Sequence, residues 1–209
     1  MSTLDRSPQI DSVPQLPFAG LVGSALLSNG NSVEIVAAQP ADFGRVRKFY
    51  ARLSDSATSA RFLGARRSLP DAELSDAVAQ DIGHHVTMLA VIEDVIIGIG
   101  EYVVTSDLNE AEVAFAVADD HHREGIATLL LERLVVVARR CGIERFIAST
   151  MFGNGDMQLV FRTLGLAVTT SYDHDVVNVT LDLSSIDTLQ AAMADRLHQA
   201  EAATTRSLQ

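Results

Sequence analysis

One short segment in the second half of the chain has the residue types and spacing of an anion-binding turn. It lies between an apolar strand pattern and the longest apolar helical pattern, and its residues are His122, Arg123, Glu124, Gly125, Ile126, Ala127 and Thr128. The first backbone N–H groups of a helix have no partners within the helix, and the dipole adds about half a positive charge at that end. Gly125 lets a ligand approach the backbone closely, and two small side chains follow it. The segment therefore predicts an anion site, although Gly125 alone also fits a plain strand-to-helix turn.

The other residues that could take part in chemistry do not predict a further site. The segment matches neither the P-loop, which needs Gly-Lys-Ser or Gly-Lys-Thr, nor the dinucleotide motif Gly-x-Gly-x-x-Gly. The histidine pairs at 84–85 and 121–122 are adjacent residues, whose side chains face opposite ways on an extended chain, so we expect no metal site. Cys141 is the only cysteine, which excludes a disulfide framework and a cysteine-based metal site.

The elements that must position the segment follow from hydrophobic periodicity and from Gly, Pro and Asn-Gly signals. We predict strands over residues 25–27, 33–36, 86–92, 95–104, 110–117, 145–151, 166–170 and 176–183. We predict helices over residues 40–53, 55–62, 71–80, 126–141, about 156–164 and 185–202.

This order predicts the fold class. A meander followed by strand–helix–strand crossovers favours an α/β (α+β) fold, with a mixed, mostly antiparallel central sheet and helices on both faces. We expect a loose N-terminal arm over 1–21, because it holds three of the five prolines and shows no periodicity. One folded domain then spans 22–184, and a C-terminal helix and tail span 185–209.

Composition limits the possible partners and location. The net charge is −11, from 16 basic and 27 acidic residues, and this argues against a nucleic-acid partner. It allows a cationic substrate, but acidity is also a common route to solubility. No run of about 18 apolar residues is present, so we expect no membrane span. The N-terminus lacks the apolar core of a signal peptide, and we expect a cytoplasmic protein.

Five motifs in order resemble the GNAT superfamily of acyl-CoA-dependent N-acyltransferases. The central one is the strand, glycine turn and helix over 117–131, followed by Asn-Gly-Asp-Met at 154–157 and Phe-Arg-Thr-Leu-Gly at 161–165. Upstream, the hairpin at 27–35, the Pro-Ala-Asp helix start at 40–42 and the run 53–64 resemble the GNAT domain of bacterial protein-lysine acetyltransferases. The resemblance covers about residues 22–183.

The resemblance implies a binding mode for acetyl-CoA or another acyl-CoA as co-substrate, with no metal. Backbone groups of Phe115 and Val117 would pair with the pantetheine arm as if it were an added strand. The amides of residues 123–128 would hold the pyrophosphate beside His122, and Asn154 would hydrogen-bond the cofactor.

The implied reaction is direct attack of an amine, most simply a protein lysine, on the thioester. A lysine has an unperturbed pKa of about 10.4, so a carboxylate must remove its proton. The resemblance places Glu112 in that role, since related lysine acetyltransferases carry a glutamate at this strand position. A solvated glutamate like Glu110 is the alternative. Tyr102 and Asp119 are lesser candidates for contact with substrate.

The motif also departs from the family pattern. His122 stands for the usual Gln or Arg, Arg123 for a small Gly, and Glu124 for a commonly basic residue, while Phe161 replaces a tyrosine found in many relatives. A glutamate beside a pyrophosphate is electrostatically unfavourable. Two alternatives therefore remain: a catalytically weak module that binds acyl-CoA or a protein partner as a regulator, and an enzyme for small-molecule amines. The sequence does not predict the oligomeric state.

Overall fold

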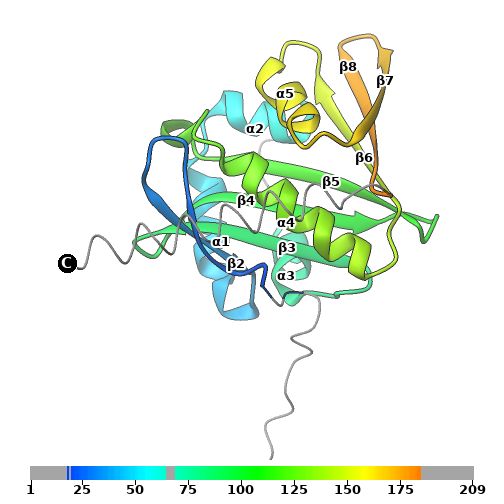
Figure 1. The fold of residues 1–209 in the computed structure, drawn as a ribbon. Helices are drawn as coiled ribbons and strands as arrows, with labels where there is room; N and C mark the ends of the chain where they lie inside the picture. The colour runs from blue at the N-terminus through cyan, green and yellow to red at the C-terminus, as the bar shows by residue number, and fades with distance from the viewer. Residues whose placement is uncertain (1–17, 19, 65–68, 185–209) are drawn as a thin grey trace, which may run out of the picture.

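A computed structural model describes residues 18, 20–64 and 69–184 and shows one eight-stranded sheet with helices on both faces (Figure 1). The strands are β1 (Gly23–Leu26), β2 (Ser32–Ala37), β3 (His85–Ile92), β4 (Val95–Val104), β5 (Glu110–Val117), β6 (Arg145–Met151), β7 (Ala167–Asp173) and β8 (Val176–Asp182). The α-helices are α1 (Phe43–Arg52), α2 (Asp55–Phe62), α3 (Asp71–Ala79), α4 (Ile126–Arg140) and α5 (Gly155–Thr163). Two 3-10 turns, η2 (Pro40–Asp42) and η3 (Asp119–His121), precede α1 and α4. The predicted fold class is confirmed.

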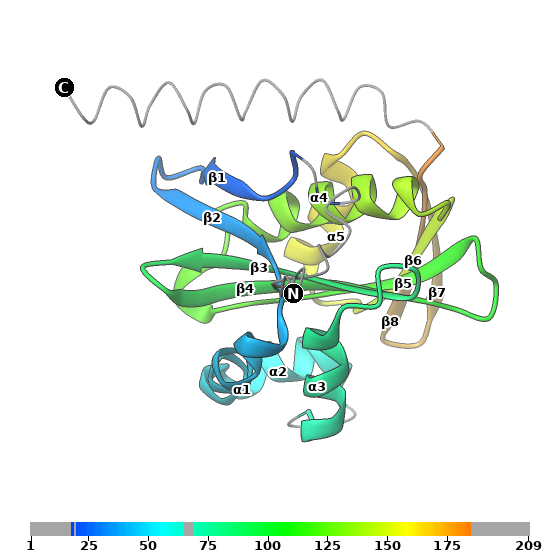
Figure 2. The ribbon, with the colours of Figure 1, turned by 90° about the horizontal axis from the view of Figure 1, so that it is seen from below.

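The sheet has the order β1-β2-β3-β4-β5-β6-β8-β7, and each neighbouring pair is antiparallel except β5 and β6. Helices α1, α2 and α3 cover one face, and α4 and α5 cover the other (Figure 2). On the second face, apolar side chains of α4 such as Leu130 and Leu134 share a core cluster with Ala25 and Leu27 of the β1–β2 hairpin. Most of the circumference of α4 is apolar, and this allows the helix to be covered by the sheet on one side and by the hairpin on the other.

Two glycines in β4 set how closely α4 approaches the sheet. A Cβ atom at Gly98 would lie 2.5 Å from the Ile126 side chain, and one at Gly100 would lie 2.9 Å from the Phe115 ring. A side chain at either position would push away the first turn of α4 or the middle of β5. These glycines therefore fix the helix start against the sheet.

The parallel pair β5 and β6 is joined over a short length only. Its paired residues are Glu110 with Arg145, Ala111 with Phe146, and Glu112 with Ile147. Beyond Glu112 the two strands separate, while β5 stays paired with β4, and β6 stays paired with β8 to its end. The separation leaves a gap in the sheet next to the start of α4.

Most predicted elements are confirmed within a residue or two. The first helix begins later than expected, because residues 40–42 form a 3-10 turn in which the Asp42 carboxylate accepts the Gln39 N–H. Strand β7 runs to Asp173, beyond the predicted end at Thr170, because it pairs with β8 up to the turn at 174–175. The polar sequence of that stretch concealed the extension. The predicted terminal helix over 185–202 lies outside the described residues, as does most of the predicted arm.

Candidate functional site

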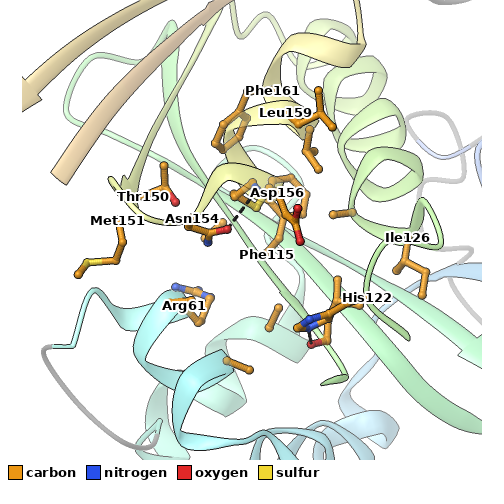
Figure 3. A pocket seen from close by; sticks show the side chains of 18 of the residues that line it. Arg61, Phe115, His122, Ile126, Thr150, Met151, Asn154, Asp156, Leu159 and Phe161 are labelled. Atoms are coloured by element: carbon orange, nitrogen blue, oxygen red, sulfur yellow. Dashed lines mark hydrogen bonds between the residues drawn. The ribbon is translucent and has the colours of Figure 1, made fainter. Parts of the chain in front are cut away.

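A cavity of about 800 Å³ occupies the gap between β5 and β6. Its walls come from α2, from the ends of β5 and β6, from the turn before α4 with the first turn of that helix, and from the start and one side of α5 (Figure 3). The lining includes residues 113–117 of β5 and 149–151 of β6. The parted strands are therefore the frame of the site.

The β5 wall presents backbone groups to the cavity. The Ala118 N–H donates to the Ile97 carbonyl at 2.9 Å, so the even-numbered residues at this end of β5 direct their backbone groups toward β4. Backbone direction alternates along a strand, and the N–H and C=O groups of Val113, Phe115 and Val117 therefore point into the gap. The His122 Nε2 atom already lies 3.1 Å from the Val117 carbonyl oxygen. This wall can pair with an extended ligand that carries amide groups.

The turn before α4 adopts the shape that an anion site needs. Arg123 and Gly125 have left-handed φ angles of 62° and 91°, and α4 begins at Ile126. The Ser28 N–H donates to the Glu124 carbonyl at 3.0 Å, and the Ser28 hydroxyl donates to the Arg123 carbonyl at 3.4 Å. These two bonds attach the turn to the hairpin. Ile126, Ala127 and Thr128 line the cavity, so the backbone amides at the helix start lie beside it.

The charges of the cavity differ from those of the whole chain. Although the chain carries a net charge of −11, the charged lining residues are Arg61 and Arg123 with a single carboxylate, Asp156, and two histidines. Glu124 is not part of the lining, and its carboxylate lies 2.9 Å from His121 Nδ1. The electrostatic repulsion expected between Glu124 and a bound anion is therefore reduced, because the carboxylate is paired with His121 and does not line the cavity.

Asn154 has two roles at the β6 end of the cavity. Its Oδ1 atom accepts the Met157 N–H at 3.1 Å and so caps α5. The same residue lines the cavity, and the cap does not use the side-chain nitrogen. The cap therefore holds a donor at the cavity wall.

Glu112 occupies the last position at which β5 and β6 are paired. Its side chain is exposed, has no hydrogen bond or ion pair among the described residues, and is not part of the cavity lining. Ala114, the next residue on the same face of β5, does line the cavity. Glu112 thus stands just outside the closed end of the gap.

The two lesser candidates lie elsewhere. Tyr102 is fully buried in the core, where its hydroxyl donates to the Ile82 carbonyl at 3.4 Å and burial raises its pKa. This position contradicts a contact with substrate. Asp119 accepts hydrogen bonds from the Ser54 hydroxyl and from the Ser54 N–H at 3.0 Å, and these bonds lower its pKa. Asp119 therefore ties the start of α2 to the end of β5.

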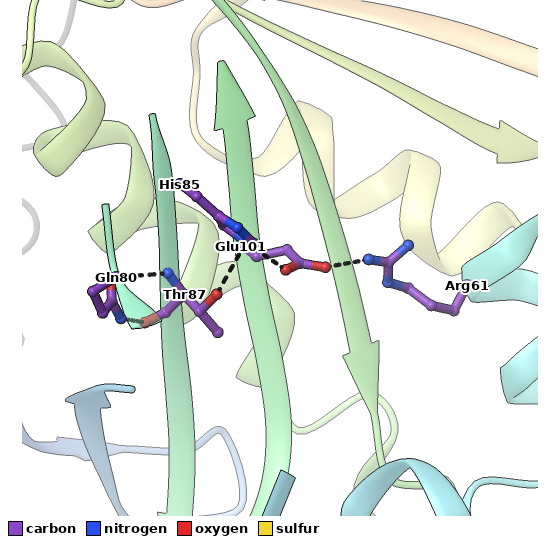
Figure 4. Close-up of polar contacts among 5 residues, drawn as sticks. All are labelled: Arg61, Gln80, His85, Thr87 and Glu101. Atoms are coloured by element: carbon purple, nitrogen blue, oxygen red, sulfur yellow. Dashed lines mark hydrogen bonds and ion pairs between the residues drawn. The ribbon is translucent and has the colours of Figure 1, made fainter. Parts of the chain in front are cut away.

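A half-buried polar cluster that was not predicted from the sequence adjoins the cavity. Arg61 of α2 lines the cavity and forms an ion pair with Glu101 of β4, and His85 Nε2 lies 2.9 Å from the other Glu101 oxygen (Figure 4). Burial alone would raise the pKa of Glu101, but the hydrogen bond from His85 and the charge of Arg61 outweigh it, so that the pKa is lowered. Burial also raises the pKa of the neighbouring Tyr50 hydroxyl. The signal for this cluster in the sequence was Glu101, a single acidic residue within the apolar run 95–104.

The described residues contain no group of three or more His, Cys, Asp or Glu side chains that could hold a metal ion. In the same part of the chain, no helix is both long enough and apolar enough to cross a membrane.

The parted parallel strands, the glycine turn and the start of α4 thus lie together around one cavity. The family model for the acetyltransferase (GNAT) family matches residues 48–166, and this chain belongs to that family.

Similar proteins include acetyltransferases. The acetyltransferase Pat of Mycolicibacterium smegmatis is 38% identical over 79 residues, which make up 38% of this chain and 23% of that protein. The GNAT domain of S. lividans PAT superposes with a TM-score of 0.72 at 29% identity, over 78% of this chain and 98% of that domain. The protein yncA of Salmonella typhimurium, solved with its cofactor acetyl-CoA, gives a TM-score of 0.61 at 22% identity, over 74% and 96%. The last likeness shows the fold alone.

Proposed function

We propose that this chain transfers an acetyl group, or another acyl group, from its CoA thioester to a primary amine, with a protein lysine as acceptor and Glu112 as general base. The neutral amine nitrogen attacks the thioester carbonyl carbon, the new C–N bond forms, and the C–S bond breaks. The CoA thiolate leaves, and the Glu112 carboxylate takes the proton of the amine directly or through water. The sequence favours a cytoplasmic site of action.

The observation that carries this proposal is the gap between β5 and β6 next to the start of α4. The pantetheine arm of CoA carries amide groups, and the gap offers it the backbone groups of Phe115 and the N–H of Val117, whose carbonyl already lies beside His122 Nε2. The pyrophosphate is an anion, and the turn at 123–128 offers it helix-start amides beside Arg123. One cavity thus matches two chemically different parts of one ligand, in the right order.

The distance of Glu112 from the cavity allows the role of base. It lies two residues from the cavity-lining Ala114 on the same face of β5, a separation of about 7 Å along the strand. A glutamate side chain, with or without one water molecule, covers such a distance. Exposure keeps the carboxylate free to exchange its proton with solvent once it has accepted one from the amine.

The charge of the chain supports an amine as acceptor. The net charge of −11 attracts a cationic lysine or polyamine, whereas the cavity lining itself favours the anionic cofactor. A neutral amine is required for attack, so the base and the acceptor must meet at the closed end of the gap.

A second candidate is a module that binds acyl-CoA without turnover and acts as a regulator. The position of Glu112 outside the cavity lining favours it. Titration with acetyl-CoA and longer acyl-CoAs, followed by melting temperature and calorimetry, tests binding. A hundredfold excess over Kd should stabilise the fold by about 2.7 kcal/mol.

Product formation separates the candidates. A lysine peptide and a polyamine, each supplied with the acyl-CoA that binds best, should show whether CoA is released and which amine is acylated. Binding without CoA release would favour the regulator. No thermal shift with any acyl-CoA at millimolar concentration would overturn both.

A further inference from the structure

A hydroxyl group on the β6 wall of the cavity has no hydrogen-bond partner. Thr150 is 2% exposed, and its Oγ1 atom is buried without a partner among the described residues. The residue nevertheless lines the cavity (Figure 3). Burying a hydroxyl without a hydrogen bond costs free energy, so such groups in a folded protein call for an explanation.

Neighbouring hydroxyls of the same lining are satisfied within the protein. The Ser149 hydroxyl donates to Asn178 Oδ1 at 2.8 Å, and the Thr163 hydroxyl donates to the Leu159 carbonyl at 2.8 Å. Thr150 is therefore not part of a wall that is generally poor in partners. Its buried hydroxyl is left to form a hydrogen bond with a ligand in the cavity.

The register of the two strands places Thr150 opposite a known feature of the other wall. Glu112 and Ile147 form the last pair, and Phe115 and Thr150 each lie three residues further along their strands. Phe115 directs its backbone N–H and C=O into the gap, as the β4 pairing requires. At this level the gap thus has peptide groups on one wall and a buried hydroxyl on the other.

We infer that Thr150 is a further binding residue for acyl-CoA, whose hydroxyl donates to a carbonyl oxygen of the acyl-pantetheine arm lying between β5 and β6. This inference rests on the proposed function. The carbonyl belongs either to a pantetheine amide or to the thioester, and both carry the acceptor lone pairs that the hydroxyl needs. With Phe115 pairing from the opposite side, the arm is held between the two strands.

The substitution Thr150→Val tests the inference, because it removes the hydroxyl and keeps the branched shape. We expect it to weaken acetyl-CoA binding about tenfold by calorimetry. The melting temperature of the ligand-free protein should stay the same or rise, since a buried group without a partner is removed. Thr150→Ser should restore binding. Loss of affinity for acetyl-CoA alone would assign the thioester carbonyl, and equal loss for free CoA would assign a pantetheine amide.

Thr87→Val is the matched control. Thr87 is fully buried on β3, lies outside the cavity lining, and has its hydroxyl 3.4 Å from His85 Nε2. This variant should lower the melting temperature and leave acyl-CoA affinity unchanged. An affinity of Thr150→Val within twofold of the unchanged protein would overturn the role of Thr150 and leave the proposed function standing. If the unchanged protein binds no acyl-CoA, the proposed function fails, and this inference fails with it.

Discussion

Glu101 and Glu112 lie on neighbouring strands and on the same face of the sheet, because Glu101 pairs with Ala114 and Glu112 with Val103. Glu101 is covered by α2, is 13% exposed at its side chain, and has partners on both oxygens. Glu112 is exposed and has no partner among the described residues. Burial and partners thus make one carboxylate part of the framework and leave the other exposed and unpaired within the described part of the chain, as the proposed base must be.

The largest effect should come from breaking the covered carboxylate. Glu101→Gln leaves the half-buried Arg61 guanidinium without its counter-charge, and we expect the free energy of unfolding to fall by about 3 kcal/mol in urea denaturation.

Glu112→Gln is the matched control for stability, since it changes the same group on the same sheet face. It should alter the free energy of unfolding by less than about 0.5 kcal/mol. Similar losses in the two variants would show that coverage by α2 does not distinguish the two glutamates.

Activity should show the reverse pattern. Glu112→Gln should lower kcat about a hundredfold, equivalent to about 2.7 kcal/mol, because the proposed base is lost. The Kd for acetyl-CoA should stay nearly constant, and the defect should shrink at high pH, where more of the amine is already neutral. A kcat equal to that of the unchanged enzyme would return Glu112 to a solvated surface residue.

The pH dependence of stability should sharpen the contrast. Folding lowers the pKa of Glu101 below its ordinary value of 4.5, so the unfolded chain binds more protons between the two pKa values. The Glu101 contribution is present above pH 4.5 and is lost as the pH falls through the folded pKa, with a slope of up to about 1.4 kcal/mol per pH unit. In acid titrations followed by urea denaturation, Glu101→Gln should lack this component. The lowered pKa of Asp119 is common to both proteins and cancels in the difference. Parallel stability curves for the two proteins would show that the Arg61–Glu101 ion pair does not contribute to the pH dependence.

The smallest effect should come from Glu124, the acid at the other end of the cavity. Glu124→Gln removes a negative charge near the helix start, where the anion would bind, and keeps a side-chain oxygen for His121. We expect acetyl-CoA to bind about threefold more tightly, with the gain lost at high salt. Calorimetry at two ionic strengths measures this. Weaker binding would mean that the His121–Glu124 pair holds the turn in its binding shape.

The elements and the central turn could be predicted because their signals are local. Residues 110–117 alternate with a period of two, a turn that ends at Gly125 follows, and an apolar helix begins at Ile126. The Arg61–Glu101–His85 cluster could not be predicted, because its members are up to 40 residues apart and meet only when α2 packs on β4. The missing partner of Thr150 was equally hidden, since a threonine in a strand pattern is ordinary until its surroundings are known. The exposure of Glu112 also depended on where β6 leaves β5.

The short junction between β5 and β6 has a consequence for cooperative unfolding. Strands β1 to β5 form one continuous ladder and β6 to β8 another, and only three residue pairs join them within the sheet. Local opening concentrates where few hydrogen bonds must break, so the two ladders can loosen from each other before either melts. A ligand that pairs with both walls of the gap would lengthen the junction and bring the two ladders closer to a single cooperative unit.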